Sequence, residues 1–293
     1  MKLYQYMVRV FVFLYIIFGC LGLAMGQMKR ERVKANIPVK AIFKAPNILL
    51  TNSVKNPYNN TLYMSIYHTF GPINSGVKEF FGLDVSANIR LGLDYGVNDR
   101  FSVGIGRTSY NKSIDGRVKY TLLYQRQNNN VPIHLSMAGD ISINTRPHAY
   151  QEPYTFSDKL GYMFMIMTAR KFSDNLSLQI SPVYAHFNKV FEGEKNDTYG
   201  LIMAGRFKLT DHMAFAMEYI PQINKAKGNY NMFTIGVNIE TGSHVFQLFI
   251  SNTEYYNPQD ILRYTRGNFW VGDIHFGFNV SRVFTFGAEG LHY

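Results

Sequence analysis

Residues 83–96 read LDVSANIRLGLDYG, and apolar and polar side chains alternate along most of this stretch. Ile89, Leu91 and Leu93 fall on one face, whereas Arg90 and Asp94 fall on the other. A period of two places successive side chains on opposite faces of an extended chain. The stretch therefore predicts a β-strand with one apolar and one polar face.

The same alternation recurs beyond residue 60, and no long stretch there has the period of an amphipathic helix. It predicts twelve strands, at residues 61–70, 83–95, 101–110, 118–126, 133–143, 160–171, 175–187, 198–208, 213–219, 230–240, 245–251 and 268–280.

Three short connections share one pattern: VNDRFSV at 97–103, FSDNLSL at 172–178 and LTDHMAF at 209–215. In each, an apolar residue is followed by a polar residue, an Asp and one further residue, after which the alternation resumes. Asn, Asp, Ser and Thr stabilise tight turns. Most other connections, such as 144–158 and 252–267, are longer and polar, and we also expect a polar loop at 111–116. Short turns at one end and long loops at the other are typical of an outer-membrane barrel.

The composition excludes several classes of protein. The 293 residues are 46% apolar and only 17% charged, unlike a disordered chain. A single Cys excludes a disulfide scaffold and a Cys-based metal cluster. A soluble β-sandwich or a lipocalin-like barrel would also alternate, but with its apolar side chains packed inside. The many strands of about 10 residues favour an all-β, antiparallel up-and-down transmembrane β-barrel with its apolar faces toward lipid.

The number of strands depends on the C-terminal residues. VSRVFTF at 280–286 resembles a weaker fourth copy of the turn pattern, which would add a thirteenth strand. Because neighbouring strands in such a barrel are antiparallel, closure requires an even number. We therefore expect twelve strands, with the last one continuing toward Phe284 or Phe286. The alternative is fourteen, with an additional strand at 41–50.

Residues 1–26 have the features of a secretory signal peptide. Lys2 and Arg9 precede an apolar run that ends at Leu23, and small residues lie just before Gln27. An uncleaved anchor is the alternative, but the run is shorter than the ~20 residues that span a bilayer. Cleavage would leave a chain with a net charge of +8 and no cysteine.

Residues 27–59 are basic and are interrupted by prolines. We expect a periplasmic lead segment, with a plug inside the barrel as the alternative. In this interpretation residues 60–286 form the barrel and residues 287–293 a C-terminal extension.

Several stretches resemble a domain-of-unknown-function family, described as a membrane-bound β-barrel, from Gram-negative bacteria of the Bacteroidota kind. They are HTFG at 68–71, NIRLGLDYG at 88–96, ETGSHVFQL at 240–248 and GDIHFGFNVSRVF at 272–284. The resemblance extends over about residues 41–286. It implies an outer-membrane barrel and no particular activity, so it assigns no functional residue.

If the apolar faces contact lipid, the opposite faces line the lumen. The candidate lumen-lining residues are Asp84, Asn88, Arg90, Asp94, His134, Asp140, Gln179, Arg206, Glu218, Asp273 and His275. Charges of both signs in such an enclosure are expected to pair, because a buried unpaired charge is costly. They would form either an internal polar network or the wall of a pore that selects solutes.

The first hypothesis for function is a narrow channel or transporter for small solutes, without enzymatic activity. The second is a non-conducting structural or docking barrel of the cell envelope. The third is a lipid-modifying enzyme that uses His134 and Ser136 as a Ser–His pair, although that face of the strand points to the lumen. No metal-ligand spacing or nucleotide-binding loop is present in the sequence, so we expect no cofactor.

The location limits the partners. A barrel in the bacterial outer membrane meets no nucleic acid, and its basic charge favours anionic outer-membrane lipid and lipopolysaccharide. A periplasmic partner could bind through residues 27–59.

Overall fold

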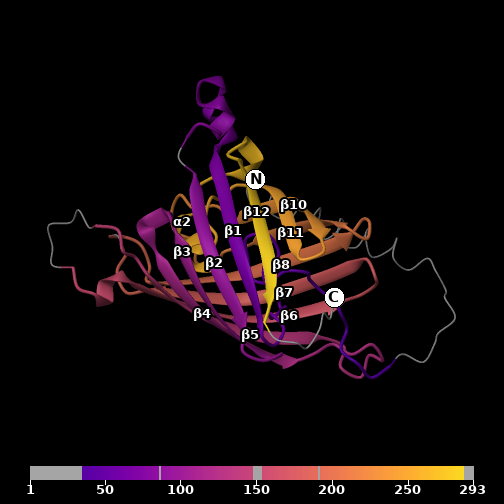
Figure 1. The fold of residues 1–293 in the computed structure, drawn as a ribbon. Coiled ribbons are helices and arrows are strands. Elements are labelled where there is room, and N and C mark those ends of the chain that lie inside the picture. Colours follow the sequence, from indigo (N-terminus) through magenta and orange to yellow (C-terminus); the bar gives the residue numbers. More distant parts are fainter. Residues whose placement is uncertain (1–34, 86, 148–153, 191, 287–293) are drawn as a thin grey trace.

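The computed structural model describes residues 35–85, 87–147, 154–190 and 192–286, which form a closed antiparallel barrel of twelve strands (Figure 1). Each strand pairs with its neighbours in chain order, and β12 closes the barrel against β1. The strands are β1 (Thr61–Pro72), β2 (Asn88–Gly96), β3 (Phe101–Thr108), β4 (Ile114–Leu123), β5 (His134–Ile143), β6 (Leu160–Lys171), β7 (Leu176–Phe187), β8 (Asp197–Lys208), β9 (Met213–Ile220), β10 (Met232–Thr241), β11 (His244–Ser251) and β12 (His275–Thr285).

Short helical segments lie in the connections. They are η1 (Ile73–Ser75), η2 (Val77–Gly82), η3 (Tyr110–Lys112), η4 (Ser157–Lys159), α2 (Pro258–Tyr264) and η5 (Phe269–Val271). None of the described helices has the length and apolarity needed to cross a membrane. The expected signal peptide (1–26) and C-terminal extension (287–293) lie outside the described residues.

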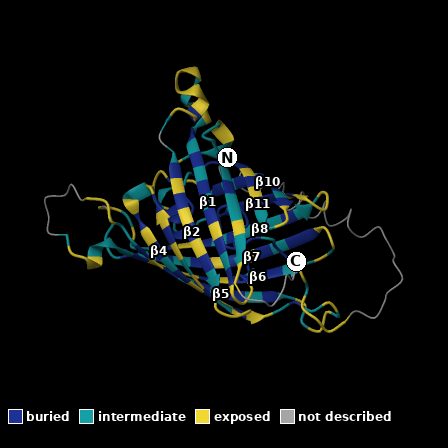
Figure 2. Cartoon of the chain, in the orientation of Figure 1, coloured by how far each residue is buried: buried dark blue, intermediate teal, exposed yellow. Residues whose placement is uncertain are grey.

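The alternation in the sequence corresponds to the two faces of the barrel wall. On β2 the side chains of Ile89, Leu91 and Leu93 are exposed, whereas Arg90 and Asp94 are buried in the interior. Figure 2 shows buried and exposed bands alternating along the strands. The prediction of an up-and-down barrel with an apolar outer face is confirmed.

The three short turns predicted from one pattern have one structure. The polar second residue of each turn is Asn98, Ser173 or Thr210, and its side-chain oxygen accepts hydrogen bonds from the backbone N–H groups two and three positions later. These turns join β2–β3, β6–β7 and β8–β9. We call their end of the barrel the turn end, and the opposite end, with the β1–β2, β5–β6 and β11–β12 connections, the loop end.

The barrel has twelve strands, which confirms the expected number over the alternative of fourteen. Residues 41–50 form no strand of the barrel. The last strand extends to Thr285, so the fourth turn-like stretch is continuous β-structure, as the parity argument requires.

The starts of three strands differ from the expectation by four or more residues. β4 starts at Ile114 because Asp115 and Arg117 already alternate inward and form buried ion pairs, so the connection from β3 is short. β2 starts only at Asn88, since the chain before it forms η2, in which Phe80, Phe81 and Gly82 have positive φ. β12 starts at His275, because the preceding residues form η5 and a turn.

The interior is not uniformly polar. Alternate residues of β6, Met163, Met165 and Met167, point inward and are buried together with Ile202 and Met232. This apolar side of the lumen was not expected from the sequence, because β6 is apolar on both faces. It exists because other parts of the chain fill the lumen and cover it.

Candidate functional site: the lumen and its occupants

Residues 42–56, which we call the lumenal segment, lie inside the barrel. The backbone N–H groups of Leu49, Leu50 and Thr51 donate hydrogen bonds of 3.2, 2.9 and 3.1 Å to the carboxylate of Glu218, and the Thr51 hydroxyl donates another at 2.7 Å. All four residues are fully buried. Successive backbone N–H groups converging on one point form an anion-binding concavity. Here the anion is a side chain of the β9 wall.

Polar side chains of other strands also bind the backbone of this segment. Gln179 accepts from the N–H of Val54 at 2.9 Å and donates to the carbonyl of Asn52 at 2.8 Å. On the opposite wall, Asn279 donates to the carbonyl of Leu49 at 2.8 Å. Lys119 donates to the Ser53 carbonyl at 3.1 Å. Hydrogen bonds of this kind satisfy backbone groups that would otherwise be buried without partners.

A second occupant fills the lumen near the loop end. The β11–β12 connection folds inward, and its helix α2 packs against β6, β7 and β8. Ile261 and Leu262 are almost completely buried, and Leu262 lies so close to Gly200 that a Cβ there would be only 2.6 Å from its Cδ2. A side chain at position 200 would therefore require Leu262 to move, and a large one would compete with α2 for the same space.

Ion pairs inside the barrel join neighbouring strands, or strands that are separated by one other strand. Arg117 binds the Asp140 carboxylate through Nε at 3.0 Å and Nη2 at 2.9 Å, and Arg90 pairs with Asp115 at 2.5 Å. Glu240 pairs with Arg206 at 2.5 Å and with Lys44 of the lumenal segment at 3.0 Å. These residues show the pairing of opposite charges that the sequence led us to expect.

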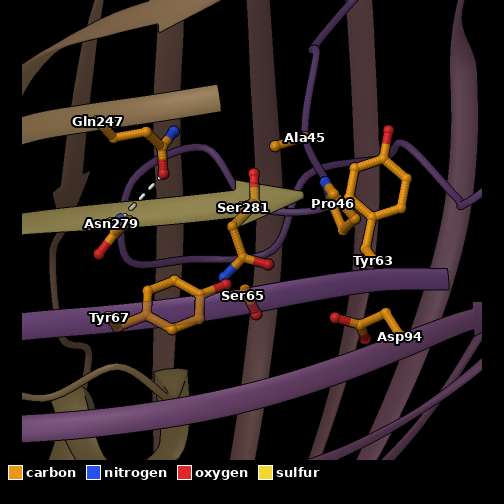
Figure 3. Close-up of a pocket in the computed structure, with 10 residues that line it drawn as sticks. Ala45, Pro46, Tyr63, Ser65, Tyr67, Asp94, Gln247, Asn279 and Ser281 are labelled. Carbon is orange, nitrogen blue, oxygen red and sulfur yellow. Dashed lines mark hydrogen bonds between the residues drawn. The ribbon is translucent and has the colours of Figure 1, made fainter. Parts of the chain in front are cut away.

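The space left between the lumenal segment and the wall is small. Figure 3 shows a pocket between Pro46 of the segment and wall residues that include Tyr63, Asp94 and Gln247. Its cavity volume is about 10 Å³, close to the minimum that holds one water molecule. The Asn279 side chain bridges to Gln247 here at 2.9 Å. In this conformation the pocket offers no path to a solute.

The structure brings eight of the eleven candidate residues into the buried interior: Asn88, Arg90, Asp94, His134, Asp140, Gln179, Arg206 and Glu218. Asp84 instead lies exposed in the β1–β2 connection, because β2 begins five residues later than expected. Asp273 precedes β12 and binds Asn74 at the loop end at 2.8 Å. His275 lies half-buried at the rim, 2.9 Å from the carbonyl of Phe70.

His134 and Ser136 share the inner face of β5 but are not joined by any hydrogen bond recorded among the described residues. The Ser136 hydroxyl lies 3.1 Å from that of Thr121 and 3.2 Å from the Val54 carbonyl. The imidazole packs edge-on against Tyr124. Asp140, the candidate orienting acid, is held by Arg117. This arrangement lacks the hydrogen-bonded nucleophile and base of a Ser–His pair.

The partners of the candidate residues are not evident from the sequence. Asp115 was assigned to a loop, although its alternation with Arg117 and Lys119 was a usable signal. Gln247 and Asn279 lie on strands that were correctly expected, but their role depends on the lumenal segment. Across the described residues, no group of three or more His, Cys, Asp or Glu side chains is arranged to hold a metal ion.

Comparison with known protein families identifies the family of this barrel. The model of the family described as membrane bound beta barrel domain (DUF5777) matches residues 43–284. The chain belongs to this family. The matched region begins inside the lumenal segment and ends in β12, so the family domain includes most of the lumenal segment as well as the wall. The protein is a membrane β-barrel.

Solved structures with a similar fold are outer-membrane proteins of low sequence identity. The NanC porin is 8% identical, with a TM-score of 0.49 over 78% of this chain and 100% of that one. The KdgM porin is 9% identical, with a TM-score of 0.45 over 78% and 99%. The COG4313 outer membrane channel from Pseudomonas putida F1 is 12% identical, with a TM-score of 0.48 over 88% and 100%. No curated protein matches the chain.

Proposed function

We propose that this DUF5777 barrel lies in the bacterial outer membrane and acts as a narrow channel for small solutes, closed at rest by its own chain. The lumenal segment closes the turn end and α2 closes the loop end. The observation that carries the proposal is how the lumenal segment is held: its contacts with the wall are side-chain hydrogen bonds, the ion pair of Lys44 with Glu240 and apolar packing. Such contacts can be exchanged for water without breaking the strand pairing that closes the barrel.

The wall on the polar side supports the same proposal. Charged side chains of β2, β4 and β5 are arranged along it as paired cations and anions. When the occupants are displaced, these residues would face water in a lumen of twelve strands, which is narrower than that of the open porins of 16 or more strands. Selection by charge and hydrogen bonding would follow. We propose lipid and lipopolysaccharide as the surroundings of the apolar outer face.

Planar-bilayer recording of the refolded full chain tests the proposal. The wild-type protein is expected to be silent. A variant that combines Glu218→Ala with Gly200→Leu loosens the lumenal segment and forces α2 away from β8, and it is expected to show unitary currents. Gly92→Ala is unsuitable as a control, because a Cβ there would meet Arg90. Leu209→Gln, in an exposed turn, is the matched control and should remain silent.

A non-conducting docking barrel is the second candidate, and one observation favours it. The lumenal segment and α2 share a continuous buried cluster with β6–β10, which includes Leu49, Met165 and Ile261. A lumen packed in this way resembles a protein core. A combined variant that remains silent while keeping the heat-modifiable migration of a folded barrel would establish this candidate and reject the channel.

A further inference from the structure

A second cavity opens at the loop end, apart from the lumenal segment. Three parts of the chain line it: the β7–β8 connection with Glu194 and Lys195, the β9–β10 connection with Lys225 and Lys227, and Arg263 of α2. Its volume is about 120 Å³. Four cationic side chains therefore surround a space that contains one carboxylate. Such an excess of one charge raises the local concentration of ions of the opposite sign.

The β9–β10 connection is fixed to the first residues of β8, which directly follow the β7–β8 connection. The side chain of Asn224 accepts from the N–H of Tyr199 at 2.9 Å and donates to the carbonyl of Asp197 at 2.7 Å. The N–H of Ile223 adds a bond of 2.9 Å to the carbonyl of Tyr199. The β9–β10 connection is thereby held along the start of β8. A cavity whose walls are already in place binds a ligand without the cost of ordering loops.

Arg263 of α2 lines the cavity and is held in place by its neighbours. It is only 6% exposed, and its guanidinium carbon lies 4.5 Å from the ring centroid of Phe187. Its Nη2 donates to Glu194 at 3.0 Å, but Nε and Nη1 have no hydrogen-bond partner within the part of the chain that the structure describes. Buried donors without an acceptor cost free energy. A fixed guanidinium with unused donors is suited to an oxyanion.

Glu194 does not neutralise the remaining cations. One of its oxygens binds Arg263, and the other lies 3.6 Å from Nη2 of Arg266. Lys195 and Lys227 are exposed and form no ion pair with any residue in the described ranges. Their ammonium groups are therefore available to a ligand.

We propose that this cavity binds an oxyanion, namely the carboxylate or phosphate group of a small ligand. Lys195 and Lys227 would contact its oxygens at the mouth, and Arg263 would bind it at the base. The volume suits one acidic group with its adjoining atoms, and not a large ligand. The group could belong to a free sugar or to the phosphorylated headgroup of a glycolipid. Exposure of the cavity to the external medium rests on the proposed outer-membrane orientation, but binding does not depend on conduction.

Isothermal titration of the full chain in neutral detergent tests the site, with glucuronate, glucose 6-phosphate and neutral glucose as probes. Millimolar affinity for the two acidic probes is expected, which corresponds to about 4 kcal/mol of binding free energy, and glucose should give no signal. The variant Lys195→Gln/Lys227→Gln should weaken binding by about tenfold or more. Lys78→Gln/Lys112→Gln removes the same charge from other exposed loop-end positions and should bind as the wild type does.

Two results would overturn the proposal: no binding of either acidic probe up to about 10 mM, or an equal loss of affinity in both double variants, which would indicate only general charge attraction. Repeating the titration in nanodiscs separates the two sources of the oxyanion. If a phosphorylated glycolipid in the disc lowers the affinity for glucose 6-phosphate, the headgroup occupies the cavity. If affinity is unchanged, the free sugar is the ligand. Because no current is measured, failure here leaves the channel proposal standing.

Discussion

Glu218 on β9 accepts a hydrogen bond of 2.9 Å from the backbone N–H of Leu50, which precedes it by 168 residues. The carboxylate also receives the two neighbouring N–H groups and has no ion-pair partner among the described residues. A buried carboxylate is tolerated only when hydrogen bonds replace its water. These hydrogen bonds therefore hold the lumenal segment in place and at the same time stabilise the buried carboxylate of Glu218.

Replacing Glu218 by Ala is expected to release the lumenal segment. Each hydrogen bond to a charged group contributes about 1.5–3 kcal/mol, and the three backbone donors would lose their acceptor. Limited trypsin digestion of the folded barrel should then cleave at Lys44 or Lys55 faster than in the wild type. Glu218→Gln keeps the shape with one acceptor oxygen and should give an intermediate rate. Equal digestion of all three proteins would show that Glu218 does not hold the segment.

The pair of Arg117 and Asp140 allows a double-mutant cycle. Asp140→Leu alone leaves a buried guanidinium without its partner and should lower the free energy of unfolding by about 3–5 kcal/mol. Adding Arg117→Met removes the stranded charge and should recover most of that loss. Urea titration of the four proteins measures the coupling. A double variant less stable than Asp140→Leu would contradict this account.

Leu91 tests the assignment of the outer face to lipid. It is 50% exposed on β2 between two inward-pointing residues. Leu91→Lys should make folding into lipid vesicles less favourable by about 2–4 kcal/mol if the position lies near the middle of the bilayer. Leu209→Lys, in the β8–β9 turn, has a similar exposure and should cost much less. Equal effects at both positions would argue against a lipid-facing β2.

The docking of α2 is expected to depend on pH through Asp260. Burial, with a further contribution from the nearby Asp115, raises the pKa of Asp260 to about 7, whereas Arg263 and Arg90 oppose the rise. Because this pKa is above that of the free side chain, the docked helix binds the proton more tightly. The contribution of protonated Asp260 to the stability of the docked helix is complete below about pH 4 and is lost as the pH rises through about 7.

Hydrogen exchange measures this effect. After correction for intrinsic exchange rates, the amides of Ile261 and Thr265 should be better protected at about pH 5 than at about pH 8. Asp260→Asn cannot ionise and should remove most of the difference. Protection that rises with pH in the wild type would reverse the assigned sign.

The sequence predicted the wall of the barrel better than its contents. Alternation in stretches such as 88–96 identifies a strand and its outer face without any knowledge of neighbours, because side-chain direction in an extended chain is local. The same reasoning placed Arg90, His134 and Gln179 in the interior. It failed at Asp84 and Asp273, where turns interrupt the strand, because strand ends depend on local backbone geometry that alternation does not encode.

The strand order, the even number of strands and the two faces of the wall can all be derived from the amino-acid sequence, since they follow from periodicity and turn chemistry within a few residues. What fills the lumen follows instead from tertiary contacts. Leu50 meets Glu218, and Leu262 meets Gly200, through contacts between residues that are distant in sequence. Such contacts depend on the shape of the space that the closed wall encloses, which exists only after the strands have paired.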